Sequence, residues 1–189
     1  MTAHERWLIH FLSNPASFPH PLLRRRVERF ETHVSHVFVA GAFAYKIKKA
    51  VKFPFIDAST LKRRRAFCRL EIALNRRLAP SLYLGVVPII ETPTGLRLGG
   101  QGRVIEYAVK MRRLPQERML DRLIAAKRVK ASQVRQIGDQ LSRFFMKTGR
   151  SRAIDRYGQS AQVAALVLGN LQECAPFLGH LLSEAQRGR

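Results

Sequence analysis

The sequence feature that most constrains the fold is a predicted β-hairpin centred on Lys46. Two runs with strand-like alternation, residues 34–40 and 43–49, flank the dipeptide Gly41-Ala42, which is typical of a tight turn. Successive side chains of a strand point to opposite faces, so the second run divides into two sets. One face carries Phe43, Tyr45 and Ile47, and the other face carries Ala44, Lys46 and Lys48.

The second face places a small residue, Ala44, two positions before a lysine, Lys46. A nucleotide bound beneath a sheet requires a flat, small contact for its base and, one pleat further along, a fixed cation for its phosphates. The spacing is compatible with that role. The alternative is a solvated strand face, and the hairpin alone does not choose between the two.

The composition adds a strong charge to this picture. The chain has 189 residues, of which 46% are hydrophobic, so it is long enough and apolar enough to bury a core. Its 34 Lys and Arg residues outnumber 13 Asp and Glu residues, which gives a formal net charge of +21. Such an excess predicts attraction to phosphate-bearing partners, namely nucleic acid, nucleotides or anionic lipid, and does not discriminate among them.

The cysteine and histidine pattern predicts neither a disulfide framework nor a metal site. Cys68 and Cys174 are far apart in the sequence, and the six histidines lack the H-E-x-x-H spacing. A reducing cytoplasm is therefore the expected location. No hydrophobic run approaches the length of a membrane span, so no membrane partner is expected.

Periodicity predicts an α+β chain that begins with a lead-in of residues 1–26, in which a short helix is expected at about 5–12. Alternation then predicts a three-stranded antiparallel meander, and two more strands follow a long helix. The expected sheet is five-stranded and antiparallel, with one helix inserted after its third strand. The predicted strands are residues 27–32, 34–40, 43–49, 82–90 and 104–111, and the predicted helix is residues 61–78.

The predicted helix follows a cluster of residues that cap helix N-termini, Asp57-Ala-Ser-Thr60. A helical wheel places Glu71 inside an apolar stripe that we expect to face the sheet. A carboxylate on a buried helix face is costly unless a cation meets it, so Glu71 requires an inward-pointing Lys or Arg. The alternative is an edge position at which Glu71 pairs locally with Asn75 or an arginine. The stripe consists of Phe67, Leu70, Leu74 and Leu78, and Arg65, Arg69 and Arg76 lie opposite it.

Near residue 112 the pattern changes from strands to helices. Residues 27–111 therefore form one predicted lobe, residues 112–115 a hinge, and residues 116–189 a helical segment. Apolar residues at helical spacing predict helices around 119–124, 134–145 and 160–174.

This order of elements resembles the small lobe of protein-kinase-like enzymes. More specifically, the chain resembles the aminoglycoside-phosphotransferase-like N-terminal part of bacterial two-part proteins, in which that part precedes a P-loop ATP-binding part. The resemblance implies a kinase-like small lobe followed by the helical start of an incomplete large lobe. It is carried by residues 31–41, 45–53, 59–68, 74–80, 82–89 and 105–113, together with Glu71.

The resemblance implies a role for each candidate site residue. Lys46 would hold the α- and β-phosphates of ATP, and Glu71 would hold Lys46 in place through an ion pair. Ala44 would lie against the adenine. ATP is thus the implied cofactor and a nucleotide the implied partner. Backbone groups of the hinge would bind the adenine edge, at Met111, Arg112, Arg113 and Leu114.

The resemblance does not extend to the groups that perform phosphoryl transfer. Such transfer needs one carboxylate that orients the acceptor hydroxyl and another that holds Mg²⁺. Beyond the hinge the aspartates are Asp121, Asp139 and Asp155, and none follows a His-x pair. We therefore assign no catalytic residue and no metal ligand, and Mg²⁺ has no complete ligand set. ATP binding is expected to be weak or vestigial.

The sequence also lacks a G-x-G-x-x-G loop and a G-x-x-x-x-G-K-[ST] motif. We therefore expect a small lobe joined to the first helices of a large lobe, as in a truncated gene product or one piece of a split protein. The predicted function is a kinase-like nucleotide-binding fragment that does not transfer phosphate by itself.

Two alternatives remain open. A basic nucleic-acid-binding protein would account for the charge of +21, although the sequence holds no RNP, helix-turn-helix, K-homology or zinc-finger signature. A scaffold that docks onto a separately encoded catalytic half shares the predicted fold and differs in its partner.

Overall fold

The structure is a computed structural model, and it describes residues 2–20 and 26–177. The chain divides into two compact units, Met1–Leu141 and Ser142–Arg189. The sheet and the helices that cover it belong to the first unit. The hinge predicted at residues 112–115 lies inside that unit, and its role as a hinge stays a prediction.

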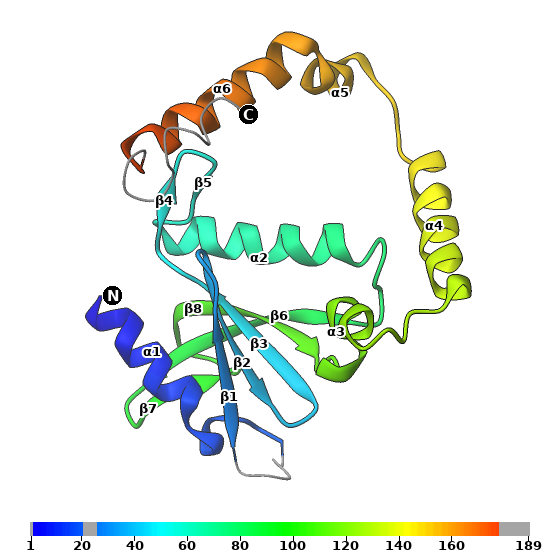
Figure 1. Cartoon of the computed structure of the whole chain (residues 1–189). Helices are drawn as coiled ribbons and strands as arrows, with labels where there is room; N and C mark the ends of the chain where they lie inside the picture. The colour runs from blue at the N-terminus through cyan, green and yellow to red at the C-terminus, as the bar shows by residue number, and fades with distance from the viewer. Residues whose placement is uncertain (1, 21–25, 178–189) are drawn as a thin grey trace. The chain divides into compact units, whose positions relative to one another are not determined.

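The first unit is built on a six-stranded antiparallel sheet (Figure 1). The strands follow the spatial order β1-β2-β3-β8-β6-β7, so the last strand in sequence lies beside β3 in the middle of the sheet. An α+β chain with an antiparallel sheet is thereby confirmed. The strands are β1 (Val27–Glu31), β2 (Ser35–Ala40), β3 (Phe43–Lys48), β6 (Tyr83–Thr92), β7 (Gly95–Leu98) and β8 (Arg103–Arg112).

The prediction of five strands was wrong, because β7 forms a sixth. Its four residues lie between two turn-rich stretches, and its pairing with β6 buries Leu98 opposite Ile89. Gly95 adopts a positive φ at the start of β7, a conformation that glycine adopts with little strain. A separate two-stranded ribbon, β4 (Lys52–Phe53) and β5 (Ile56–Asp57), was also not predicted.

Helix α1 (Ala3–Ser13) covers one face of the sheet. Thr2 and Glu5 form a capping box at its N-terminus, and its apolar side contributes Leu8 and Leu12 to the main core. The short helix predicted in the lead-in is thereby confirmed. The sheet residues of this core include Phe38, Tyr45, Ile47, Ile89 and Ala108.

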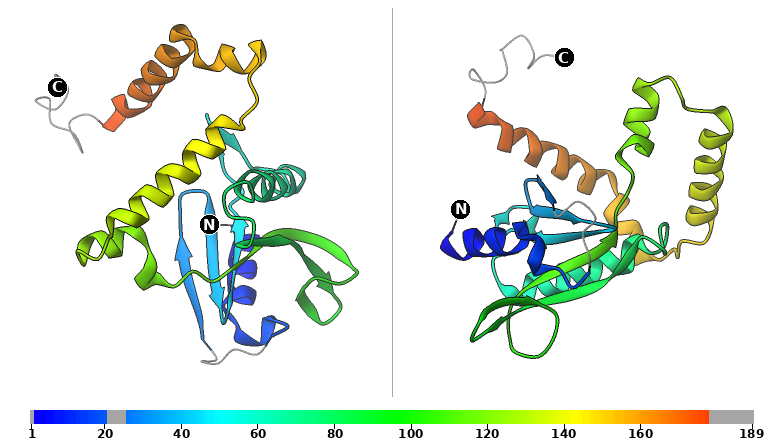
Figure 2. Two further views of the ribbon diagram at one scale, coloured as in Figure 1. Left: turned by 90° about the vertical axis from the view of Figure 1, so that its right-hand side faces the viewer. Right: turned by 90° about the horizontal axis from the view of Figure 1, so that it is seen from below.

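Helix α2 (Leu61–Asn75) covers the opposite face, and in the left view of Figure 2 strands β6 and β8 lie between α1 and α2. Thr60 caps α2 by accepting a hydrogen bond from the backbone amide of Arg63. Cys68 and Ile72 pack against Val109 of β8. The helix therefore begins where the capping cluster predicts, and it ends before residue 78.

The predicted apolar stripe of α2 was wrong, because Leu70, Leu74 and Leu78 are exposed. The side that faces the sheet carries Arg64 instead, which is buried. Its guanidinium Nε donates a hydrogen bond to Oε2 of Glu106 on β8 at 2.8 Å, and this partner compensates for the burial of the charge. The side of α2 that faces the sheet therefore includes a charged residue paired with a distant strand, and it differs from the side that hydrophobicity alone predicts.

The described chain beyond β8 is helical, and the three predicted helices are confirmed. None of α3, α4, α5 and α6 contains a buried residue. Among the helices of residues 2–20 and 26–177, none combines the length and the apolar character that a membrane crossing requires. The remaining elements of the chain are η1 (Pro15–Ser17), η2 (Gln116–Arg118), α3 (Leu120–Ala125), α4 (Ala131–Met146), α5 (Arg152–Asp155), η3 (Arg156–Gly158), α6 (Ser160–Cys174) and η4 (Ala175–Phe177).

Candidate functional site

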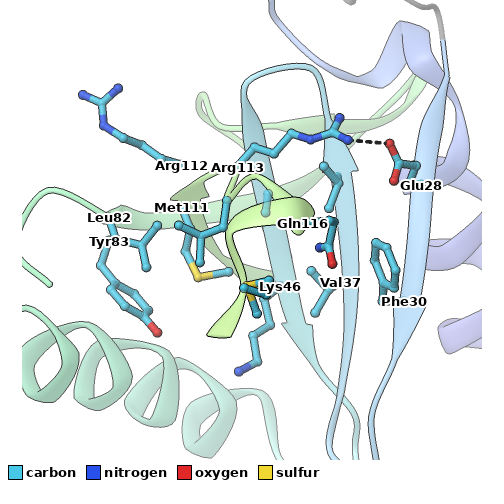
Figure 3. Close-up of a pocket in the computed structure, with 14 residues that line it drawn as sticks. Glu28, Phe30, Val37, Lys46, Leu82, Tyr83, Met111, Arg112, Arg113 and Gln116 are labelled. Atoms are coloured by element: carbon cyan, nitrogen blue, oxygen red, sulfur yellow. Dashed lines mark hydrogen bonds and ion pairs between the residues drawn. The ribbon is translucent and has the colours of Figure 1, made fainter. Parts of the chain in front are cut away.

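The first unit contains a cavity of about 330 Å³ beside strand β3 (Figure 3). Its walls come from β1, β2 and β3, from the start of β6 and from the end of β8 with the residues that follow. Strand β3 contributes Ala44 and Lys46, and their cross-strand neighbours Val39 and Val37 continue the wall on β2. Most lining side chains are apolar, and the charged residues in the wall are Glu28, Lys46, Arg112 and Arg113.

The two faces of β3 divide as the sequence predicts. Tyr45 and Ile47 are buried in the core that α1 covers, and Phe43 packs against it. Ala44 and Lys46 line the cavity on the other face. The alternative of a wholly solvated strand face therefore does not hold for this hairpin.

Glu71 of α2 meets two lysines of β3. Its Oε1 accepts a hydrogen bond from Lys46 Nζ at 2.9 Å, and its Oε2 accepts one from Lys48 Nζ. The structure thus supplies the inward-pointing cation that the sequence requires for Glu71. Asn75 bonds to the backbone carbonyl of Glu71, not to its carboxylate. The second lysine partner, Lys48, was not predicted.

The ionisation of Glu71 follows from these contacts. Burial by itself would raise the pKa of Glu71, but the hydrogen bonds from Lys48 and Lys46 outweigh that effect, so the pKa lies below its usual value. Glu71 is therefore ionised at neutral pH. The cluster of one carboxylate and two ammonium groups carries a net positive charge beside the cavity.

Two neighbours of this cluster are held in their neutral forms. Burial raises the pKa of the Cys68 thiol to about 12, so the thiol is not a nucleophile at neutral pH. Burial also raises the pKa of the Tyr83 hydroxyl, with a smaller contribution from the charge of Glu71. The charged groups at this end of the cavity are thus the two lysines and Glu71.

All four residues predicted to bind the adenine edge line the cavity, namely Met111, Arg112, Arg113 and Leu114. Two of their amides are already engaged within the protein. The Arg112 amide donates to the Leu82 carbonyl oxygen and the Arg113 amide donates to the Ala42 carbonyl oxygen, each at 2.9 Å. A ligand that binds this segment must therefore use other backbone groups of it.

The sequence did not predict the part that β1 plays in the cavity. Glu28 of β1 accepts a hydrogen bond from Arg113 Nη2 at 2.9 Å at the edge of the cavity, and Phe30 also lines it (Figure 3). The position of Val37 in the cavity wall could have been predicted, because the hairpin turn places Val37 opposite Lys46. The contact between Glu28 and Arg113 could not be predicted in this way, because 85 positions separate the two residues in the sequence.

The two aspartates beyond the hinge that belong to the first unit, Asp121 and Asp139, do not line the cavity. Asp121 is in α3 and Asp139 in α4, whereas Asp155 is in α5 of the second unit. Within the described ranges, no three His, Cys, Asp or Glu side chains are grouped so that they could hold a metal ion. Lys46 lines the cavity, and its positive charge can attract an anion there.

Two arginines of the predicted basic face of α2 are engaged in structural contacts. Arg65 lies over the ring of Tyr107, 5.3 Å from its centroid. Arg76 donates to the carbonyl oxygens of Tyr83 and Leu84 at 2.7 and 2.6 Å. These contacts tie α2 to β8 and β6, so part of the positive charge of α2 serves the fold.

The chain is similar to uncharacterized proteins of Mycobacterium tuberculosis and Mycobacterium bovis. Each of these relatives is 34% identical to it over 143 residues. The match covers 76% of this chain and 27% of each relative, so it spans little more than a quarter of the relatives' length. No protein-family model matches the chain, and no solved structure matches it.

Proposed function

We propose that the cavity is a nucleotide-binding site in which Lys46 contacts the phosphates. The observation that carries this proposal is that Ala44 and Lys46 line one wall while Glu71 holds the lysine ammonium at 2.9 Å. An ammonium that is already held in place loses little side-chain entropy when an anion binds. The small Ala44 side chain leaves room for a flat ring beside it.

The apolar walls suit a nucleobase. Val39 and Met111 are the cross-strand neighbours of Ala44 on either side, so three adjacent strands form a flat contact surface. A cavity of about 330 Å³ is at the lower end of the range of about 300–1,000 Å³ that small-molecule sites occupy. That size accommodates a base and part of its sugar, with the phosphates directed toward Lys46.

The wider proposal is that the first unit is a kinase-like small lobe and that its ligand is ATP. An antiparallel sheet, one helix on the cavity side and a Lys46–Glu71 ion pair between them are the parts that protein kinases use to hold the α- and β-phosphates. Phosphoryl transfer also requires carboxylates at the reacting phosphate, and Asp121 and Asp139 of the first unit do not line this cavity. We therefore propose ATP binding without transfer by this chain alone.

Isothermal titration calorimetry with ATP tests the proposal on wild type and Lys46→Met. The substitution should weaken binding by about 10- to 150-fold, because a hydrogen bond to a charged group contributes about 1.5–3 kcal/mol. Lys52→Met is the matched control, because Lys52 is exposed and lies outside the cavity wall. Equal weakening in the two variants would show that binding depends on the overall charge of +21, and would favour the nucleic-acid alternative.

A second function, docking onto a separate polypeptide, is favoured by the helices beyond β8. None of α3, α4 and α6 contains a buried residue. Helix α4 exposes an apolar stripe at helical spacing, formed by Val134, Ile137, Leu141 and Phe145. Exposed apolar surfaces of this kind are typical of interaction sites. We propose that a separately encoded catalytic half covers this stripe.

Co-expression tests the docking proposal. The probe is the part of the Mycobacterium tuberculosis relative that lies outside the 143 matched residues. The two should co-elute in size-exclusion chromatography, and Ile137→Asp should separate them. Gln136→Asp adds the same charge on a neighbouring side of α4 and should leave the complex intact. Loss of the complex in both variants, or no complex with wild type, would contradict the proposal.

A further inference from the structure

Two ammonium groups share one carboxylate beside the cavity. Lys46 and Lys48 are two positions apart on β3, so both reach the same side of the sheet. Each takes a different oxygen of Glu71, Lys46 at Oε1 and Lys48 at Oε2. Figure 3 shows the Lys46 side chain directed from the strand toward α2, where Glu71 lies. One of the two positive charges is therefore in excess over what Glu71 needs.

The two lysines differ in their access to a ligand. The side chain of Lys46 is 26% exposed and lines the cavity, whereas that of Lys48 is 9% exposed and does not line it. Glu71 itself is 12% exposed, so it depends on its partners for compensation of its charge. Lys48 is thus placed to pair with Glu71, and Lys46 is placed to meet a ligand.

A ligand phosphate that draws Lys46 toward itself weakens the bond between Lys46 and Glu71. With a single lysine, that movement would leave a mostly buried carboxylate with an uncompensated charge, which is unfavourable. Lys48 is bonded to Oε2, so Glu71 would keep one cation if Lys46 turned to the ligand.

We propose that Lys48 is a positioning residue, the standing counter-ion of Glu71 that releases Lys46 for the phosphate. This inference rests on the proposed nucleotide site for the identity of the ligand. Lys48 acts through Glu71 and does not touch the phosphate. Its effect on binding must therefore disappear when the charge of Glu71 is removed.

A double-mutant cycle with ATP tests this dependence by calorimetry. Lys48→Met should weaken ATP binding by about tenfold, equivalent to one charge-assisted hydrogen bond, and leave adenosine binding unchanged. Lys48→Arg should restore most of the affinity, because the guanidinium also pairs with a carboxylate. In the Glu71→Gln background, Lys48→Met should have no effect on ATP. An equal loss in both backgrounds, or an equal loss for ATP and adenosine, would overturn the proposal.

Thermal melting without nucleotide tests whether Lys46 and Lys48 share the Glu71 carboxylate. Lys46→Met and Lys48→Met should each lower Tm little, because the remaining lysine still pairs with Glu71. The double variant leaves Glu71 without a cation, and its Tm should fall by more than the sum of the two single losses. Additive losses would overturn the role of Lys48. If wild type binds neither ATP nor adenosine, the proposed nucleotide site fails, and this melting result still supports or overturns the sharing of Glu71.

Discussion

The ion pair between Arg64 and Glu106 leads to a prediction of a large loss of stability in Arg64→Met. The two residues are 5% and 2% exposed, and Arg64 Nε lies 2.8 Å from Glu106 Oε2. Arg64 Nη1 also donates to the carbonyl oxygens of Ala58 and Ser59, each at 3.1 Å. Methionine fills much of the same space, but it leaves the Glu106 carboxylate without its cation and both carbonyls without this donor.

The magnitude follows from the cost of an unpaired buried charge. Removing one partner of a buried ion pair costs about 3–5 kcal/mol. For a chain of this size, each kcal/mol lowers Tm by about 2–4 °C, so Tm should fall by about 6–20 °C. Melting followed by circular dichroism measures the change. Arg63→Met is the matched control, because Arg63 pairs with Asp57 at the surface, where ion pairs contribute little.

Two further results bear on the same reasoning. Arg64→Met combined with Glu106→Leu should recover most of the lost stability, because the uncompensated carboxylate is gone. Burial raises the pKa of Glu106, with Arg64 opposing the effect, so the free energy of unfolding of Arg64→Met should decrease as pH rises through that pKa. The loss relative to wild type should be smaller at about pH 5 than at about pH 8. An Arg64→Met protein that melts within a few degrees of Arg63→Met at both pH values would refute the account.

Three further predictions concern the cavity and its surroundings. Ala44→Leu should occupy the space beside Lys46 and weaken ATP binding by about tenfold or more in calorimetry, without a fall in Tm. The pKa of Glu71 lies below its ordinary value of 4.5, so its ion pairs stabilise the fold above about pH 4.5 and lose that contribution as pH falls through the folded-state pKa. The difference in Tm between wild type and Glu71→Gln should accordingly shrink on acidification, and a constant difference would count against the ion pairs. In an Ellman titration the thiol of the exposed Cys174 should react at once, and that of the buried Cys68 should react only after unfolding. Rapid reaction of both thiols would show that α2 does not bury Cys68.

The hairpin around Lys46 could be predicted because its information is local. Strand alternation and one turn fix which side chains of β3 share a face, and the structure places Ala44 and Lys46 together on the cavity side. Glu71 does meet two lysines, although the apolar stripe from which its inward position was predicted is not the side of α2 that faces the sheet. A sequence pattern is thus enough to predict a contact where secondary structure alone determines which side chains are neighbours.

The orientation of α2 could not be predicted in the same way. Its buried side includes Arg64, whose partner Glu106 lies 42 positions away on a strand. The predicted apolar stripe placed Leu70 toward the core, but Leu70 is exposed and Arg64 is buried. The pairing of Glu28 with Arg113 is equally non-local. Contacts of this kind form only in the tertiary structure, so helix and strand propensities do not predict them.

The measurement that tests the central claim most directly is an NMR titration of the ¹⁵N-labelled protein with ATP at physiological ionic strength. If the cavity binds the nucleotide, chemical-shift changes should concentrate on the backbone amides of Ala44, Lys46, Met111 and Leu114, which come from two strands and the segment that follows. Lys46→Met should move these changes to much higher ATP concentrations, in line with its weaker binding. Shift changes confined to exposed basic side chains of α2, such as Lys62 and Arg69, would instead show that ATP meets only the general positive charge of the chain, and would contradict the proposed site.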